Sequence, residues 1–314
     1  MNTLLDKFSA VEIKADNRIS AADKEFCEVQ QRSYHTACDA LVDIATRVAQ
    51  YVEEQRAIID QPFEYLDNKF NSSEYDDVIK KNHGHFVHQL VNHFTGMYRV
   101  SISADDIIEN LVPAKPGEPT SPYSWWWKRD WTDEELNKWK ETQERYKEAC
   151  AEYRDRIRAF RLDYSDVVDQ IITQLDGLSF TEKAIKELKD ASHEAAWNHY
   201  RHEKKYDRKK GTLTFSYGCS HSDWHDTFEL HEDMKKVVRA LAYYEYQSLN
   251  GANQYYGFRD LLGYRMDYPE FDFSDANTEK IKSVKCFKNG RVDIKFKKES
   301  YAREFEEQYV GLEE

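Results

Sequence analysis

Two groups of histidine carry the side chains that metal chemistry would need. The first is the segment NHGHFVHQLVNH, which contains His83, His85, His88 and His93. Its two middle histidines are three residues apart and would share one face of a helix, where a divalent metal is conceivable. A catalytic zinc helix usually has the pattern HExxH, and no carboxylate interrupts this run. We therefore interpret the run as a solvated or hydrogen-bonded helix face and predict no metal there.

A mixed set of thiol, imidazole and carboxylate groups follows a predicted strand further along the chain. It consists of Cys219, His221, Asp223, His225 and His231. Metal binding by this set is the weaker interpretation. The sequence also has no GxxxxGK[ST] phosphate loop, GxGxxG turn or GxSxG nucleophile motif. We therefore expect a protein without a cofactor that is not an enzyme.

Two stretches repeat apolar residues with the three-four spacing of a helix over about forty positions each. The first contains Tyr34, Ala37, Leu41, Ile44, Val48, Tyr51, Gln55 and Ile58. The second contains Leu136, Trp139, Gln143, Tyr146, Cys150, Tyr153, Ile157, Phe160, Tyr164, Val167, Ile171 and Gln174. Capping boxes at Ser20–Asp23 and Thr132–Glu135 predict where the two helical arms begin. Tyr, Cys and Gln make a poor zipper, so we expect the arms to pack on each other or on a shorter helix. Ordinary core helices of an all-α domain are the alternative.

A proline- and tryptophan-rich insert over residues 113–131 separates the arms. Prolines fall at every third residue from Pro113 to Pro122, which is the period of polyproline II. An aromatic run follows, and Trp and Arg are frequent binding hot spots. The predicted partner-binding residues are Trp125, Trp126, Trp127, Arg129 and Trp131. The alternative is a hydrophobic plug at one end of the arms.

The pattern changes near Gly177, so we predict an arm region over residues 1–176 and a C-terminal head over 177–314. In the head we expect helices over 181–205 and 231–249, a strand over 211–217 and a closing helix over 300–309. A β-hairpin over 281–296 is predicted from Asn289-Gly290, which is typical of a type I′ turn. The predicted fold class is therefore α+β and mostly α, with long helical arms and a small α+β head.

Composition and charge restrict the possible partners. The 314 residues have a net charge of -13, which opposes direct binding to DNA phosphates but suits a surface that docks where nucleic acid normally binds. A basic run over residues 201–210 is the exception, and we interpret it as a solvated helix end. Five scattered cysteines indicate reduced thiols inside a cell. No export signal or membrane-spanning run is predicted, and the heptad seams predict a homo-oligomer.

The segment EKIKSVKCFKNGRVDIKFK, residues 279–297, resembles the hairpin of a family of unknown function that is common in phages, plasmids and other mobile elements. The preceding strand over 212–217 and helix over 232–246 fit that family's order. Members also tend to open with a long charged helix. The resemblance covers about 100 residues and does not extend to the tryptophan-rich insert or the second arm.

In the same phage setting, long helical arms with a compact head resemble the Gabija anti-defence proteins. That resemblance implies a viral protein in the host cytoplasm that binds the bacterial Gabija nuclease complex and keeps it from engaging or cutting DNA. It assigns no residue of this chain to the interface. A DNA-associated accessory protein of a mobile element and a metal-dependent enzyme are the alternatives.

Overall fold

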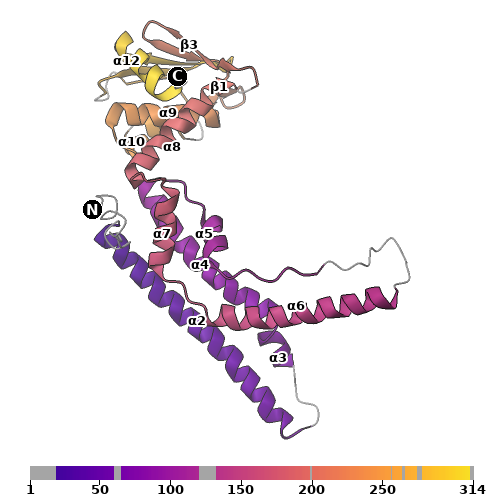
Figure 1. Cartoon of the computed structure of the whole chain (residues 1–314). Helices are drawn as coiled ribbons and strands as arrows, with labels where there is room; N and C mark the ends of the chain where they lie inside the picture. Colours follow the sequence, from indigo (N-terminus) through magenta and orange to yellow (C-terminus); the bar gives the residue numbers. More distant parts are fainter. Residues whose placement is uncertain are drawn as a thin grey trace, which may run out of the picture. The chain divides into compact units, whose positions relative to one another are not determined.

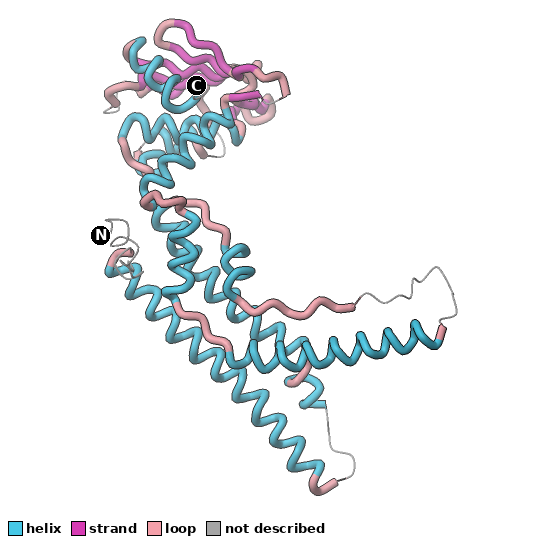
Figure 2. Tube along the Cα trace, viewed as in Figure 1, coloured by secondary structure: helices cyan, strands magenta, loops and turns pink. Residues whose placement is uncertain are grey.

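The computed structural model describes residues 19–59, 65–119, 132–198, 200–255, 257–263, 266–273 and 278–311. The chain divides into two compact units. Unit 1 consists of residues 1–97 and 102–177, and unit 2 consists of residues 98–101 and 178–314. The fold is α+β and mostly helical, and Figure 2 shows the described strands gathered in unit 2.

Unit 1 is built from helices. They are α2 (Ala21–Arg56), α3 (Tyr65–Phe70), α4 (Ser73–Tyr98, whose last residue belongs to unit 2), α5 (Ala104–Leu111), α6 (Asp133–Ala159) and α7 (Tyr164–Gln174). Both predicted capping boxes are present at the starts of α2 and α6. Two hydrogen bonds between Ser103, the N-cap residue of α5, and Gln174 at the end of α7 hold these two helices together.

The prediction of one unbroken second arm was wrong, because the helix stops at Ala159 and restarts at Tyr164. Phe160 has extended backbone angles, and Asp163 caps α7 by accepting a hydrogen bond from the backbone N–H of Ser165. The backbone N–H of Leu162 donates to the buried Tyr34 hydroxyl at 3.0 Å. Side chains from outside the arm therefore stabilise a break that the apolar spacing alone does not reveal.

Unit 2 combines a helical layer with small sheets (Figure 1). Its helices are α8 (Phe180–Ala195), α9 (Glu232–Tyr246), α10 (Gly251–Gln254), α11 (Phe258–Leu261), α12 (Glu299–Phe305) and the π-helical turn η2 (Glu306–Val310). Its strands are β1 (Trp197–Asn198), β2 (Glu203–Lys204), β3 (Tyr206–Lys209), β4 (Thr212–Phe215), β5 (Cys219–Ser222), β6 (Thr227–Leu230), β7 (Glu270–Asp272), β8 (Ile281–Cys286) and β9 (Val292–Phe296).

The main sheet of unit 2 has the antiparallel order β3-β4-β9-β8-β7. Residues that alternate along β9, Val292, Ile294 and Phe296, are buried, as expected for a sheet with one face on a core. The ring of Phe305 on α12 lies 5.6 Å from Phe296 and 5.5 Å from Tyr244 on α9. The closing helix therefore packs on the sheet, as predicted.

Two local predictions in unit 2 were wrong. The helix expected over 181–205 ends at Ala195, because the next residues turn back as the β1–β2 hairpin, in which Trp197 pairs with Lys204. In the β8–β9 hairpin, Gly290 has a φ of 85° but Asn289 does not have positive φ, so the turn is not type I′. Instead, the Asn289 side chain accepts a hydrogen bond from the backbone N–H of Arg291 at 3.2 Å.

Candidate partner-binding surface

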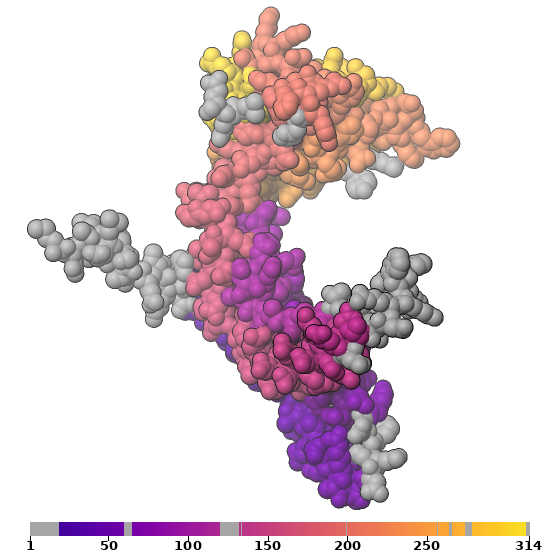
Figure 3. Space-filling view, turned by 45° about the vertical axis from the view of Figure 1, so that its right-hand side comes forward, coloured from indigo at the N-terminus to yellow at the C-terminus, as the bar shows by residue number. Residues whose placement is uncertain are grey.

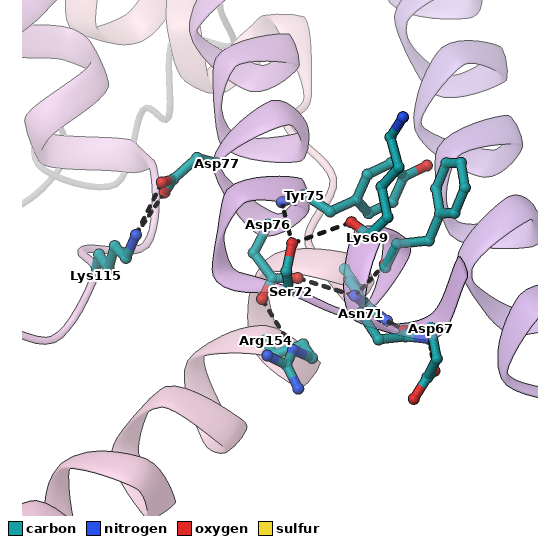
Figure 4. Close-up of polar contacts among 11 residues, drawn as sticks. Asp67, Lys69, Asn71, Ser72, Tyr75, Asp76, Asp77, Lys115 and Arg154 are labelled. Carbon is teal, nitrogen blue, oxygen red and sulfur yellow. Dashed lines mark hydrogen bonds and ion pairs between the residues drawn. The ribbon is translucent and has the colours of Figure 1, made fainter. Parts of the chain in front are cut away.

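Helices α4 and α6 of unit 1 meet at a junction that buried polar side chains stabilise. Asp76 on α4 is buried, and its carboxylate contacts Arg154 at 2.9 Å and Arg158 at 3.0 Å, both on α6. Arg158 also donates to the Asn71 side chain at 2.8 Å and to the Phe70 carbonyl at 3.1 Å. One carboxylate therefore ties the base of α6 to α4, as Figure 4 shows for Arg154 and Asp76. Arg158 extends the link to the end of α3.

A second buried contact fixes α2 at the same junction. The Tyr34 hydroxyl donates to His83 Nδ1 at 2.7 Å, while His83 Nε2 donates to the Ile157 carbonyl at 3.2 Å. The ring of Tyr34 also stacks on Phe86 with the ring centres 4.3 Å apart. Burial lowers the pKa of His83, so the imidazole is neutral and has one donor and one acceptor nitrogen, as this geometry requires.

Beyond this junction α2 carries an apolar stripe that the rest of the described chain leaves exposed. Ile44, Tyr51 and Ile58 are 42%, 43% and 76% exposed. We call these three residues the α2 stripe. Ile44 and Tyr51 are seven residues apart and therefore lie along one side of α2 over about 10 Å, and Ile58 follows in the turn after the helix ends at Arg56. Large apolar side chains repeated on one face indicate a binding surface more than single exposed ones do.

Another side of α2 is covered by neighbouring parts of unit 1. Ala45 and Val52 are buried, and α2 contacts the short helix α3. The Tyr75 hydroxyl also donates to the Leu41 carbonyl at 2.9 Å. The prediction that an arm packs on a shorter helix is therefore confirmed for α2, but that contact does not cover the α2 stripe.

The first part of α6 is also little covered. None of residues 134–152 is buried, whereas Tyr153 and Ile157 near the base are. Figure 1 shows α6 and the C-terminal half of α2 running out from the junction in different directions, and in Figure 3 the far end of α2 projects from unit 1. The expected packing of the two arms along each other is therefore limited to the junction.

Polar contacts hold residues 114 and 115, in the segment that follows α5, against α4 and α6. The Lys115 ammonium contacts the Asp77 carboxylate at 2.9 Å (Figure 4), and Arg156 on α6 donates to the Ala114 carbonyl at 3.3 Å. The predicted partner-binding residues of the insert lie outside the described residues, so their role stays a prediction. They are Trp125, Trp126, Trp127, Arg129 and Trp131.

Three of the four histidines in the first candidate metal cluster have separate partners. His83 bonds Tyr34, His85 lies 3.3 Å from the Gln89 amide, and His93 pairs with the buried Asp23 at 2.7 Å. Within the described ranges, no three His, Cys, Asp or Glu side chains come together as a possible metal site. His83 contacts α2 and α6, and His93 contacts α2, so the histidines point toward different partners. The spacing in the sequence does not reveal this.

The second candidate cluster is also divided. His221 lies 3.0 Å from Asp223 and 3.1 Å from Asp226, whereas His231 donates to the Tyr217 carbonyl at 2.8 Å. Cys219 interacts with another cysteine, Cys286. A hydrogen bond from the Cys286 thiol lowers the pKa of Cys219 to about 7 and raises that of Cys286.

The basic run over 201–210 is not a helix end but the strands β2 and β3 and their flanks. Lys204 contacts Glu306 at 3.1 Å, Arg208 also pairs with Glu306, and Lys205 contacts Asp233 at 2.9 Å. Three cations of the run thus pair with two carboxylates, since Lys204 and Arg208 share Glu306, and the ion pairs neutralise the run in part.

Comparison of the chain with protein-family models, with curated proteins and with solved structures finds no match. No helix in the described part of the chain is long and apolar enough to cross a membrane.

Proposed function

We propose that this protein acts by binding another protein and carries out no reaction of its own. The partner we propose is the bacterial Gabija nuclease complex in the cytoplasm of an infected host, as the resemblance implies. The observation that carries the proposal is the α2 stripe, in which Ile44 and Tyr51 are exposed on one side of α2 and Ile58 is exposed in the turn that follows the helix.

The α2 stripe has the chemistry of a protein contact. A helix that presents apolar side chains with this spacing can lie in a hydrophobic groove of a partner, and a central tyrosine is a frequent hot spot. The buried contacts of Asp76 and His83 hold the bases of the arms before any partner arrives. A preorganised surface loses less conformational entropy on binding, which favours affinity.

Charge supports a contact near a DNA-binding surface of the partner. The net charge of -13 would be attracted to the basic residues that a nuclease uses to hold DNA. An inhibitor seated there would block DNA engagement or cleavage without chemistry. We therefore expect inhibition to weaken at high ionic strength, because surface charges are screened within about 8 Å at physiological salt.

Size-exclusion chromatography with a reconstituted Gabija complex tests this function, with DNA cleavage assayed on the same fractions. Co-elution with abolished cleavage is the expected result. Separate elution with undiminished cleavage would contradict the proposed partner.

Self-association is a separate proposal that the heptad seams of the sequence support. We expect the mass measured by light scattering to rise with protein concentration. If the aspartate variant Tyr51→Asp abolished that rise, the α2 stripe would join two copies of the chain; if the rise persisted, the stripe would remain free for the partner. A mass equal to one chain at every concentration would refute self-association.

A further inference from the structure

Unit 2 contains a cavity of about 290 Å³ between the helices α8, α9 and α10. None of its lining residues belongs to the α2 stripe or to the junction of unit 1. Its lining consists of Arg99, Ala184, Glu187, Leu188, Ala191, Lys236, Arg239, Leu249, Ala252 and Asn253. All of these residues belong to unit 2, so the cavity is a feature of one compact body.

The floor of the cavity is apolar. Ala184, Leu188 and Ala191 lie on one face of α8, since they are four and three residues apart, and Leu249 and Ala252 close the floor from the other side. Ala184 and Ala252 are buried. Small alanines at these positions leave room where larger side chains would fill the space between the helices.

The rim of the cavity is cationic. Lys236 and Arg239 are three residues apart on α9 and share one face, and Arg99 adds a third positive charge. Among the described residues, neither arginine has a hydrogen bond or ion pair, and Lys236 is 3.8 Å from Asp233. One carboxylate, that of Glu187, also lines the cavity, so the net charge of the lining is positive.

Both flanks of Arg99 are fastened to α8. Tyr98 stacks on Phe180 with the ring centres 4.4 Å apart, and the backbone N–H of Ser101 donates to Glu187 at 2.8 Å. One carboxylate oxygen of Glu187 thus accepts a hydrogen bond that positions the backbone next to Arg99. Arg99 itself has a φ of 61°, a left-handed conformation in which glycine or asparagine would be less strained. This conformation is common directly after a helix, and α4 ends at Tyr98.

We propose that this cavity binds a small organic anion, in which a carboxylate or phosphate group is carried on a compact apolar body. The guanidinium groups of Arg99 and Arg239 would pair with the oxyanion, since planar guanidinium suits both kinds of oxygen acid. The apolar body would cover the alanine floor. A ligand with both parts fits a cavity at the small end of the range for ligand sites. The proposal does not depend on the partner assigned to unit 1.

Isothermal titration of the full chain with four probes tests the proposal. Benzoate and phenyl phosphate carry both features, inorganic phosphate has no apolar body, and benzyl alcohol has no charge. We expect benzoate or phenyl phosphate to bind saturably and more tightly than inorganic phosphate or benzyl alcohol. Whether benzoate or phenyl phosphate binds more tightly identifies the preferred anionic group. Equal binding of inorganic phosphate would indicate a general ion effect and would overturn the proposal, as would no saturable binding of any organic anion.

Two variants locate the binding to the cavity. Arg99→Asn removes the charge but tolerates the left-handed backbone, and Arg239→Gln removes a charge on an exposed helix position. Each should weaken binding of the preferred probe about tenfold, because a charged hydrogen bond is lost. Arg303→Gln on α12, an exposed arginine outside the cavity, is the matched control and should bind normally. Unchanged affinity in Arg239→Gln, with its circular dichroism preserved, would exclude this cavity even if the Arg99 variant failed to fold.

Discussion

Two neighbouring aspartates at the base of the arms, Asp76 and Asp77, differ in burial and in the number of their partners. Asp76 and Asp77 are adjacent on α4, and both pair with cations. Asp76 is buried and has two arginine partners, whereas the Asp77 side chain is 42% exposed and pairs with Lys115. Sequence position does not separate the two aspartates, because which one faces the base of α6 depends on how the helices pack.

The substitution Asp76→Asn should lower the free energy of unfolding by about 2 to 3 kcal/mol, because it leaves Arg158 partly buried beside a neutral group. The same change at the neighbour, Asp77→Asn, should cost less than about 1 kcal/mol, as is usual for exposed ion pairs. Urea unfolding followed by circular dichroism measures both. Equal costs for the two variants would refute the structural role of the buried carboxylate.

His83 should give stability a pH dependence. Burial lowers its pKa from the ordinary 6.5, so the unfolded chain takes up the proton first and the contribution of this residue is lost as the pH falls below 6.5. The variant His83→Gln cannot titrate. We therefore expect the wild type to melt above the variant at pH 7.5 and the difference to shrink at pH 5.5. A difference that stays constant or grows on acidification would contradict a neutral buried imidazole.

At the scale of elements, helix starts were predictable and helix ends were not. The capping boxes at Ser20 and Thr132 are local patterns of four residues, and both are present in the structure. The break after Ala159 depends on Tyr34, which lies over a hundred residues earlier and bonds Leu162. The early end of α8 likewise depends on the pairing of Trp197 with Lys204. Long-range contacts of this kind leave no periodic signal in the sequence.

The exposed part of α6 should be less stable than the junction that holds its base. Residues 134–152 have no buried member, and most of the stability of a helix in a protein comes from packing of its apolar face. We expect their amides to exchange with deuterium faster than those of Phe86 and Leu90 in the buried part of α4. Equal protection of the two helices would mean that a second copy of the chain, or another segment, covers α6 in solution.

At the scale of the whole molecule, the fold class was predictable because helical periodicity and a strand-rich C-terminal part differ in composition. The candidate binding surface was only partly predictable. The first arm's seam contains Ile44, Tyr51 and Ile58, but the sequence does not tell which side of a long helix its own core covers. The exposed side follows from α3, a helix of six residues that the periodicity did not indicate.

The central claim is that this protein inhibits a partner through the α2 stripe. Titration of wild type, Tyr51→Asp and the matched control Thr46→Asp against DNA cleavage by the Gabija complex tests it most directly. Thr46 is exposed on another side of α2, five residues earlier, so both variants add the same charge to the same helix. We expect Tyr51→Asp to raise the half-inhibitory concentration about thirtyfold, a hot-spot loss, and Thr46→Asp to leave it unchanged. Equal inhibition by all three proteins, with their circular dichroism preserved, would contradict the account.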